Sequence, residues 1–239
     1  MRAVLTFHSV DHLSGPLSYP PAALEALLSA LAQADIPVLS LDELLEDKQS
    51  HGVSITFDDG LSSVFATAMP ILRAHNAPAH VFAITGWVGR DNRWPGQPAG
   101  APALKLMEWT ELEEVQKAGC LIEAHTATHP DLRTLSNSQI ADEFDEANSV
   151  IEGRLGRRPR YLAYPYGYHD ARVRAIAARA YRGCFTTRLD YLHAAVSLNA
   201  IPRLDAHYLR STRLVRNLDG QGARAYIALR RALRRLRGH

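Results

Sequence analysis

The sequence predicts an α/β fold in which parallel strands alternate with helices. Short apolar runs rich in β-branched and aromatic residues recur along the chain, and segments with apolar residues at helical spacing lie between them. Strands that alternate with helices are typical of a parallel sheet or barrel. The chain has 239 residues, of which 46% are hydrophobic, and no segment reads as a linker. One barrel and two small domains are therefore equally compatible with its length.

Turn residues and capping patterns place the first elements. A strand over residues 4–10 ends where Asp11 breaks its apolar run, and Pro21 suits the first turn of the helix that follows. Ser40, with Glu43 three residues later, forms a capping-box pattern that predicts a helix over 41–46. The remaining elements of this part are a short strand at 38–39, a strand over 53–57, a helix through 64–72 and a strand over 80–85.

A long segment rich in Gly and Pro, residues 86–102, follows the strand at 80–85. It is too long for an ordinary connection and contains Trp87 and Trp94. We expect it to be a functional loop over a site, whose tryptophans pack on a ring-shaped ligand; disorder is the alternative.

The later elements follow from the same signals. Thr110, followed by acidic residues, is the expected cap of a helix that ends at Gly119. Apolar residues on one face predict a long helix over 138–155, which Gly156 ends. Strands are expected over 120–124, 161–164, 183–187 and 198–201, with a helix over 173–180.

The two cysteines and the apolar runs indicate the compartment. Cys120 and Cys184 each follow a glycine at the start of an expected strand, so we expect two reduced core residues and no disulfide. The apolar run at the N-terminus is too short for a signal peptide, and no later run is long enough to span a membrane. We therefore expect a cytoplasmic protein, provided that the chain has not lost an export signal.

Side chains able to do chemistry follow several of the expected strands. They are His8, the pair Asp58 and Asp59, the pair His125 and His129, and Pro165-Tyr166-Gly167. Because the carboxyl ends of parallel barrel strands gather on one face, these residues are expected to meet.

The two pairs suggest a metal site. Adjacent carboxylates at the mouth of a buried strand repel each other, so Asp58 and Asp59 need a cation or a shared proton, unless they only form a turn with Gly60. His125 and His129 are four residues apart, a spacing that can aim both imidazoles at one point. Two histidines and one carboxylate suit a divalent metal with open coordination positions.

Three motifs, taken in order, resemble the polysaccharide deacetylases of the NodB-homology type, carbohydrate esterase family 4. They are Thr-Phe-Asp-Asp-Gly at 56–60, His-Thr-x-x-His at 125–129 and Tyr-Pro-Tyr-Gly at 164–167. The likeness spans roughly residues 4–203. It implies a distorted (β/α) barrel of parallel strands, here a single NodB-like domain over residues 1–220. It also implies a bound divalent metal and the removal of N-acetyl groups from an amino sugar in a polysaccharide or glycan precursor.

The resemblance also assigns roles to individual residues. It implies that Asp59, His125 and His129 are the metal ligands, and that Asp58 is the general base that takes a proton from the metal-bound water. The backbone N–H of Tyr166 would stabilise the oxyanion. Zinc is the expected metal, and cobalt, nickel or iron are alternatives for such a ligand set.

The sequence departs from the family pattern at two positions, so the residue that orients the base and the residue that acts as the general acid are not given by the motifs. The third motif commonly has an arginine that orients the base, but this sequence has Ala163 there. The C-terminal Leu-x-His motif, which supplies the general acid, is not evident. Phe7-His8-Ser9-Val10 resembles the aromatic-His-x-Val opening of one branch of the family, so His8 is the expected acid, with His207 and His193 as alternatives.

The C-terminal segment, residues 221–239, is expected to form a basic helix packed on the domain or extending from it. It contains six arginines and no acidic residue, although the whole chain has a formal charge of only +2. A narrow apolar stripe at helical spacing consists of Tyr226, Leu229, Leu233 and Leu236. A packed helix with a solvated basic face is the simpler interpretation, and weak contact with an anionic membrane or glycan is the other. Nothing further in the sequence indicates nucleic-acid binding.

Other functions are compatible with the same residues. The chain could be a catalytically weak member of the fold that binds metal and glycan without turnover, because the usual arginine and C-terminal histidine are missing. It could instead hydrolyse another amide or imide, or associate with membranes through its basic helix.

Overall fold

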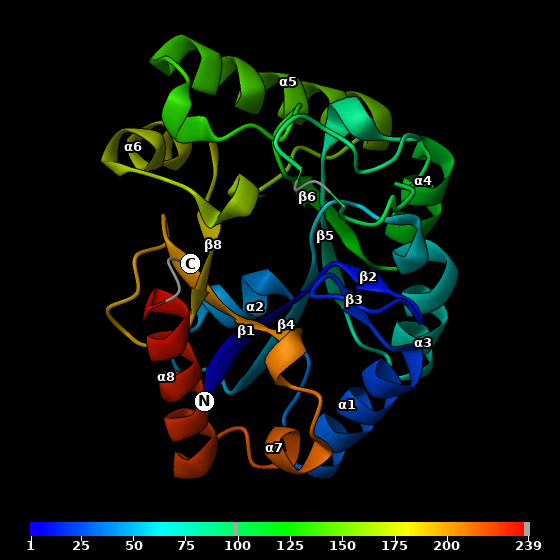
Figure 1. Cartoon of the computed structure of the whole chain (residues 1–239), viewed down its shortest axis with the longest axis vertical. Coiled ribbons are helices and arrows are strands. Elements are labelled where there is room, and N and C mark those ends of the chain that lie inside the picture. The colour runs from blue at the N-terminus through cyan, green and yellow to red at the C-terminus, as the bar shows by residue number, and fades with distance from the viewer. Residues whose placement is uncertain (98–99, 237–239) are drawn as a thin grey trace.

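Seven parallel strands form a closed barrel in the computed structural model, which describes residues 1–97 and 100–236 (Figure 1). In barrel order the strands are β1 (Arg2–Phe7), β4 (Gly52–Phe57), β5 (Ala79–Ala83), β6 (Leu121–Ala124), β7 (Tyr161–Ala163), β8 (Gly183–Leu189) and β9 (Ile201–Asp205). The barrel closes where β9 pairs with β1 at Leu5↔Leu204 and Thr6↔Asp205. The expected single-domain barrel of parallel strands is therefore confirmed.

The barrel is distorted because its pairing is uneven. Six residue pairs join β1 to β4, whereas β6 and β7 meet only at Ala124↔Leu162. The register of β8 against β9 also shifts between Phe185 and Leu189.

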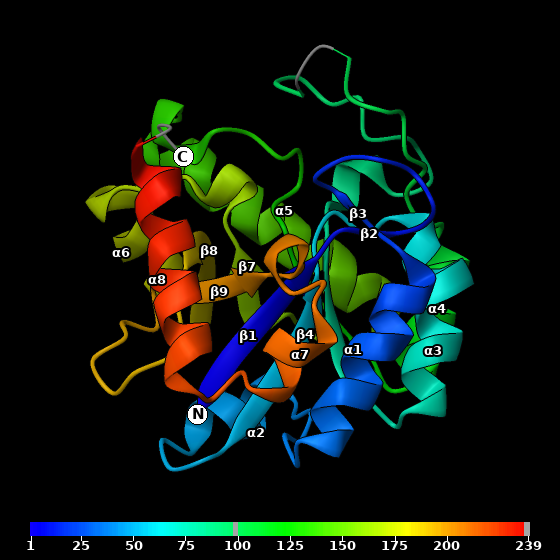
Figure 2. The ribbon, with the colours of Figure 1, turned by 60° about the horizontal axis from the view of Figure 1, so that its bottom comes forward.

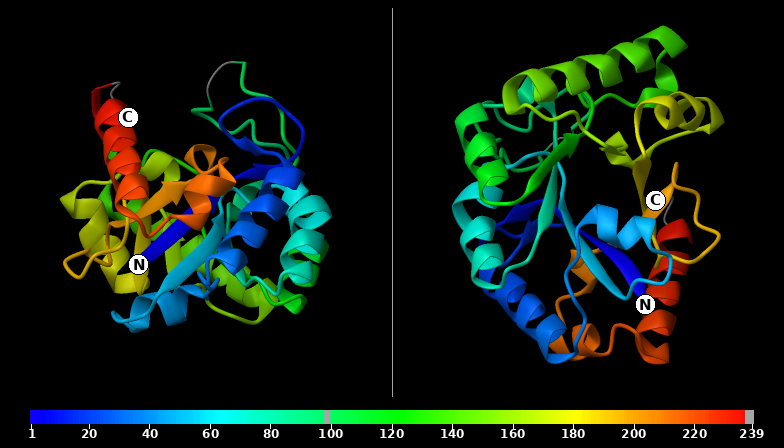
Figure 3. Two further views of the ribbon diagram at one scale, coloured as in Figure 1. Left: turned by 90° about the horizontal axis from the view of Figure 1, so that it is seen from below. Right: turned by 180° about the vertical axis from the view of Figure 1, so that it is seen from behind.

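Helices surround the barrel (Figure 3). They are α1 (Pro21–Gln33), α2 (Leu41–Glu46), α3 (Met69–Ala74), α4 (Trp109–Lys117), α5 (Asn137–Leu155), α6 (Ala171–Ala180), α7 (Thr212–Arg216) and α8 (Gln221–Leu236). The capping box expected for α2 is present, since Ser40 Oγ accepts the Glu43 N–H and the Glu43 carboxylate accepts the Ser40 N–H. Such reciprocal bonds satisfy donors that the first helical turn leaves free.

Several expected boundaries are wrong. The first strand divides at His8, because β2 (Ser9–Val10) leaves the barrel and pairs with β3 (Ser18–Tyr19) in a separate small sheet. The expected strand at 38–39 is a single bridge between Val38 and Val53. The last strand is β9 and not residues 198–201, since the Ala200 N–H bonds to the Ser197 carbonyl in a turn before it.

Two helix starts also differ from expectation. Thr110 lies inside α4, whose cap is Glu108; the Glu108 N–H donates to the Glu111 carboxylate at 2.8 Å. The helix expected through 64–72 begins as a π-helical segment, Val64–Ala68, before it continues as α3.

An apolar cluster joins side chains from five barrel strands. Its strand residues are Val4, Phe82, Tyr161, Ala163, Phe185 and Ile201, all fully or almost fully buried. Side chains from strands around a closed barrel can meet in this way only in its interior, so the barrel is a packed core and not a pore.

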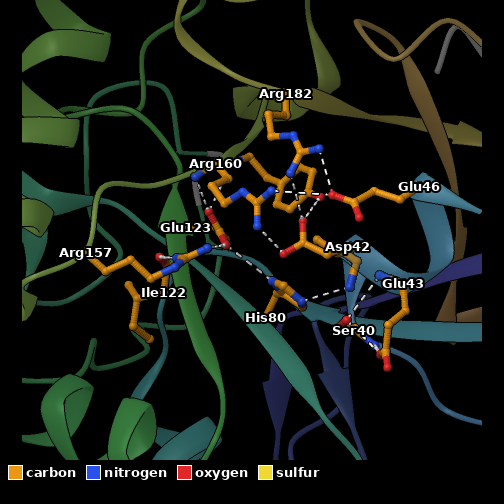
Figure 4. A network of polar contacts seen from close by, with 12 residues as sticks. Ser40, Asp42, Glu43, Glu46, His80, Ile122, Glu123, Arg157, Arg160 and Arg182 are labelled. Carbon is orange, nitrogen blue, oxygen red and sulfur yellow. Dashed lines mark hydrogen bonds and ion pairs between the residues drawn. The ribbon is translucent and has the colours of Figure 1, made fainter.

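A buried polar network ties α2 to the barrel near the beginnings of β5, β6 and β7 (Figure 4). The fully buried Glu123 accepts 2.8 Å and 2.7 Å bonds from Arg157 Nη2 and the Arg160 N–H, and a 3.0 Å bond from the Tyr161 N–H. His80 Nε2 accepts the N–H of the first residue of α2 at 3.0 Å, which leaves its Nδ1 facing Glu123 at 3.4 Å. Because every carboxylate oxygen is paired, this buried charge fixes the position of α2.

The C-terminal helix α8 packs through a different face than expected. Ala223 and Ile227 are its buried residues, whereas Leu229, Leu233 and Leu236 face solvent, with Leu236 85% exposed. Tyr226 of the expected stripe is partly buried against the core, so the helix packs through Ala223, Tyr226 and Ile227, and the three leucines of the stripe lie outside the packing surface. Residues 237–239 of the expected basic helix lie outside the described residues.

Two further expectations concern the cysteines and the membrane. Cys120 and Cys184 are both buried and free of disulfides, as expected. Among the described residues, no helix combines the length and apolar character needed to cross a membrane.

Candidate metal and catalytic site

Asp58 and Asp59 lie in a tight turn directly after β4. The Asp58 N–H donates to the Phe7 carbonyl at 2.9 Å, which continues the pairing of β4 with β1 beyond the strand. Asp59 and Gly60 then adopt the left-handed conformation, with φ of 69° and 73°. The two carboxylates are only 3% and 5% exposed, so they do more than form a solvated turn.

His125 follows β6 and points one ring nitrogen at the aspartates. Its Nδ1 lies 2.7 Å from the Ala163 carbonyl, which can only accept, so Nδ1 carries a proton and Nε2 is the atom that faces Asp59 at 3.4 Å. Ala163 thus contributes its backbone carbonyl to the site.

A strained loop brings His129 to the same point. Thr126 and His129 both have a left-handed backbone, with φ of 68° and 63°, and Thr126 Oγ1 accepts the His129 N–H at 3.0 Å. From α5, the Glu143 carboxylate holds the loop by accepting the N–H groups of Ala127 and Thr128, each at 2.9 Å. His129 Nε2 consequently lies 3.9 Å from Asp59 Oδ1.

The three expected ligands meet in one place. Asp59, His125 and His129 each offer one ligand atom, and these atoms lie within 4.8 Å of one another. Ligand atoms about 2.0–2.2 Å from one tetrahedral ion would be about 3.4 Å apart, close to the 3.4 and 3.9 Å histidine–aspartate distances found here. The donor set therefore fits a divalent metal ion.

The charges at this point also favour a cation. Burial lowers the pKa of His129 to about 3, helped by the nearby His125, so His129 is in the neutral form that binds metals. Burial alone would lower the pKa of His125, but the hydrogen bond and charge of Asp59 and the charge of Asp58 raise it. The aspartate pair thus favours positive charge here, either as a proton on His125 Nε2 or as a metal ion in its place.

Arg203 holds Asp58, and sequence reasoning missed it. From β9, its Nη1 and Nη2 donate to the two carboxylate oxygens of Asp58, each at 2.7 Å, and its Nε donates to the Thr186 carbonyl at 3.2 Å. Burial alone would raise the pKa of Asp58, but the charge and hydrogen bonds of Arg203 hold it below its ordinary value. Asp58 is therefore ionised and fixed in orientation.

A signal for this arginine was available in the sequence. Arg203 interrupts the apolar run Ile201-Pro202-Arg203-Leu204 and is 1% exposed. A charge within a buried strand requires a partner, and Asp58 was a carboxylate that required a cation. The expected strand at 198–201 ends before Arg203, so the sequence pattern does not predict its pairing with Asp58.

The three candidate acids occupy different places. His8 lies between β1 and β2 and directly follows Phe7, whose carbonyl accepts the Asp58 N–H at 2.9 Å, so its backbone lies next to the aspartate pair. His207 is exposed in a 3₁₀ turn after β9, with its ring against Tyr208. His193 is exposed and follows Leu192, which bridges to Arg2 at the opposite end of β1.

Aromatic rings form a wall around His129. The rings of Tyr166 and Trp94 lie 4.5 and 4.7 Å from the His129 ring, centroid to centroid, and Trp87 packs against Trp94. The segment 86–102 thus lies over the site as expected, apart from residues 98–99, which are outside the described residues. Trp94 is only 3% exposed, so it supports His129 and does not present a free face to a ligand.

The comparison with known families is decisive at this point, because the profile of the polysaccharide deacetylase family matches residues 46–182. The chain belongs to the polysaccharide deacetylase family. This stretch contains both aspartates, both histidines and Tyr166, whereas Arg203 and His8 lie outside it.

Two curated relatives show how far the likeness extends. The poly-β-1,6-N-acetyl-D-glucosamine N-deacetylase of Staphylococcus aureus strain N315 is 31% identical over 166 residues, which are 63% of this chain and 54% of that protein. YxkH of Bacillus subtilis strain 168 is 24% identical over 191 residues, 77% of this chain and 63% of that protein. The chain thus spans less than two thirds of the length of these relatives.

Solved structures show the same fold. The deacetylase PplD of Streptococcus pyogenes, solved in complex with acetate, superposes with a TM-score of 0.73 at 24% identity and covers 85% of this chain and 91% of that one. IcaB from Ammonifex degensii gives a TM-score of 0.71 at 23% identity, covering 85% and 90%. At these sequence identities the structural likeness shows that the barrel fold is shared.

Proposed function

We propose that this polysaccharide deacetylase is a metal-dependent hydrolase that removes N-acetyl groups from an amino sugar in a polysaccharide or glycan precursor. The observation that carries the proposal is the pairing of Asp58 with Arg203 beside the Asp59, His125 and His129 group. Asp58 is fixed by the guanidinium and is not one of the three grouped ligands, so it is available for proton transfer. Asp59 faces the imidazoles of His125 and His129. The names of the S. aureus and S. pyogenes relatives support the reaction class.

Asp59, His125 and His129 would hold the metal ion, for which zinc suits the ligand set best and cobalt, nickel or iron are alternatives. When bound, such an ion activates water and polarises the amide carbonyl as a Lewis acid. His125 keeps its Nδ1 proton on the Ala163 carbonyl, so its Nε2 lone pair stays directed at the site.

Asp58 would act as the general base. Because Arg203 holds its pKa down and fixes both oxygens, Asp58 is ionised at neutral pH and its remaining lone pairs can accept a proton from the attacking water. The hydroxide joins the acetyl carbon, and the negative charge that develops on the carbonyl oxygen is expected to meet the backbone N–H of Tyr166.

His8 would act as the general acid. When the C–N bond breaks, the amine nitrogen of the sugar needs a proton, and the imidazole of His8, which follows the Phe7 carbonyl bonded to the Asp58 N–H, would donate it. The products are acetate and the free amino sugar.

A binder without turnover has two arguments in its favour, the missing arginine at Ala163 and the missing C-terminal histidine. Arg203 provides a bidentate guanidinium to Asp58, so the first argument no longer holds. The observation therefore favours an enzyme.

The test is acetate release from oligomers of N-acetylglucosamine, both β-1,4- and β-1,6-linked. The protein is assayed with added zinc, after treatment with a chelator, and as the variants Asp58→Asn and Asp145→Asn. Asp145 is exposed on α5 and serves as the charge-matched control. We expect chelation and Asp58→Asn each to lower the rate by about 100-fold or more, and the control to stay within about twofold. Full activity of Asp58→Asn, or no acetate from any oligomer with the zinc-loaded protein, would refute the proposal.

A further inference from the structure

A second concave site lies beside the metal site, in a pocket of about 380 Å³ between the turn after β7, strand β8 and helix α8. Helix α8 lies against β8 (Figure 2). We call this concave site the basic pocket. Its lining residues with polar or charged side chains are Tyr168, His169, Arg174, Thr186, Thr187, Arg188, Arg231, Arg234 and Arg235.

Positive charge exceeds negative charge in the basic pocket. Five arginines line it and no acidic residue does. Two carboxylates that do not line the pocket pair with some of these arginines. Asp190 forms ion pairs with Arg231 and, over 3.5 Å, with Arg188. Asp205 lies 3.7 Å from Arg234. Five guanidinium groups therefore share two carboxylates.

Two arginines of the basic pocket have unused donors. Within residues 1–97 and 100–236, no carboxylate oxygen lies within 4.0 Å of a guanidinium nitrogen of Arg174 or Arg235. Arg174 Nε is buried and has no hydrogen-bond partner in that part of the chain. A buried donor without an acceptor costs about 1–3 kcal/mol, and an anionic ligand would supply the acceptor.

The donor set matches a phosphate group. Guanidinium groups recognise tetrahedral oxyanions through paired N–H donors, and five of them line the pocket. The small residues Gly167 and Ala200 also line the pocket and leave its volume open. The volume falls within the range of about 300–1,000 Å³ typical of small-molecule sites.

The basic pocket shares a wall with the catalytic site. Gly167 lines the pocket and follows Tyr166, whose ring packs on His129 at 4.5 Å. Thr186 lines the pocket as well, and its carbonyl accepts the Nε proton of the arginine that holds Asp58. A group bound in the pocket would thus lie next to the metal site.

We propose that the basic pocket binds a phosphate group, carried by a phosphorylated glycan or lipid headgroup or free in solution. This inference does not rest on the deacetylase reaction, because it concerns binding by residues outside the metal and catalytic set.

The first test is calorimetric titration of the full chain with inorganic pyrophosphate. The pocket variant combines Arg174→Gln with Arg235→Gln. The charge-matched control combines Arg179→Gln with Arg216→Gln, two arginines that are exposed and lie outside the pocket. We expect saturable binding by the wild type, a loss of affinity of about tenfold or more in the pocket variant, and a change within about twofold in the control. Equal weakening in both variants, or no saturable binding by the wild type, would overturn the proposal.

A second variant covers the case in which Arg174→Gln fails to fold, because Arg174 is half-buried. Arg235 is exposed and has no ion pair in the described part of the chain, so Arg235→Gln alone is expected to fold, as thermal unfolding would show. It is expected to weaken pyrophosphate binding about threefold. Unchanged affinity in a folded Arg235→Gln would count against the pocket.

The source of the phosphate is distinguished with three probes. They are inorganic phosphate, N-acetylglucosamine 1-phosphate and sedimented vesicles that contain phosphatidylglycerol. Tighter binding of the sugar phosphate than of inorganic phosphate would indicate a phosphorylated glycan, and co-sedimentation that the pocket variant loses would indicate a lipid headgroup. If the pocket variant keeps wild-type binding to all three probes, the proposal fails.

Discussion

The interaction of Asp58 with Arg203 can be tested by a double-mutant cycle. Arg203→Met keeps much of the length and apolar contact of the side chain but leaves Asp58 as a buried carboxylate without its cation. The pair is 3% and 1% exposed and has two 2.7 Å hydrogen bonds, so little water can replace the guanidinium. Removing one partner of such a pair costs about 3–5 kcal/mol, a large part of the roughly 5–15 kcal/mol that stabilises a typical domain.

The second arm of the cycle removes the orphaned charge. In Asp58→Asn with Arg203→Met, neither half of the pair remains as an unpaired buried ion, so the double variant is expected to be more stable than the sum of the single effects predicts, by about 1–3 kcal/mol. Arg158→Met is the control, because its 3.2 Å pair with Glu152 is about half exposed on both sides and contributes little.

The assay is urea unfolding of metal-free protein at neutral pH, followed by circular dichroism. The pKa of Asp58 is lowered in the folded chain, so the contribution of the pair is complete above the ordinary aspartate pKa of about 4 and is lost as the pH falls through the folded value. Neutral pH therefore reports the full effect. Wild-type stability of Arg203→Met, or strict additivity in the double variant, would show that the two side chains do not depend on each other.

Three further outcomes are expected. His8→Ala should lower the rate of acetate release about 100-fold and His207→Ala less than about twofold, and equal losses would remove His8 as the acid. Glu123→Gln should lower the free energy of unfolding by roughly 3 kcal/mol because it breaks a fully buried charge network. The control Glu152→Gln changes an exposed residue and should alter the free energy of unfolding by less than about 0.5 kcal/mol. Similar urea midpoints for the two variants would contradict this prediction. Gly167→Ala should reduce both stability and acetate release, since its φ is +72° and a Cβ there would lie 2.3 Å from a threonine hydroxyl oxygen; an unchanged variant would show that this turn tolerates a side chain.

Local signals sufficed where the structure depends on neighbours in sequence. The capping box of α2, the end of α5 at Gly156 and the strand before Asp58 are set by residues a few positions apart, and each was predicted. Boundaries failed where tertiary contacts decide. The first strand ends at Phe7 because β2 pairs with β3, and this pairing is not visible in the period of the apolar residues.

The sequence by itself determined the parallel α/β architecture and the residues able to form a metal site. The order of strands and helices brings their carboxyl ends to one face, and the motif residues follow those strands, so Asp59, His125 and His129 could be expected to meet. Only the tertiary structure decided what holds the base. Arg203 is 145 positions from Asp58 in the chain, and closure of the barrel between β9 and β1 puts it next to the end of β4. The partner of a buried charge is chosen by spatial proximity, which local sequence patterns do not report.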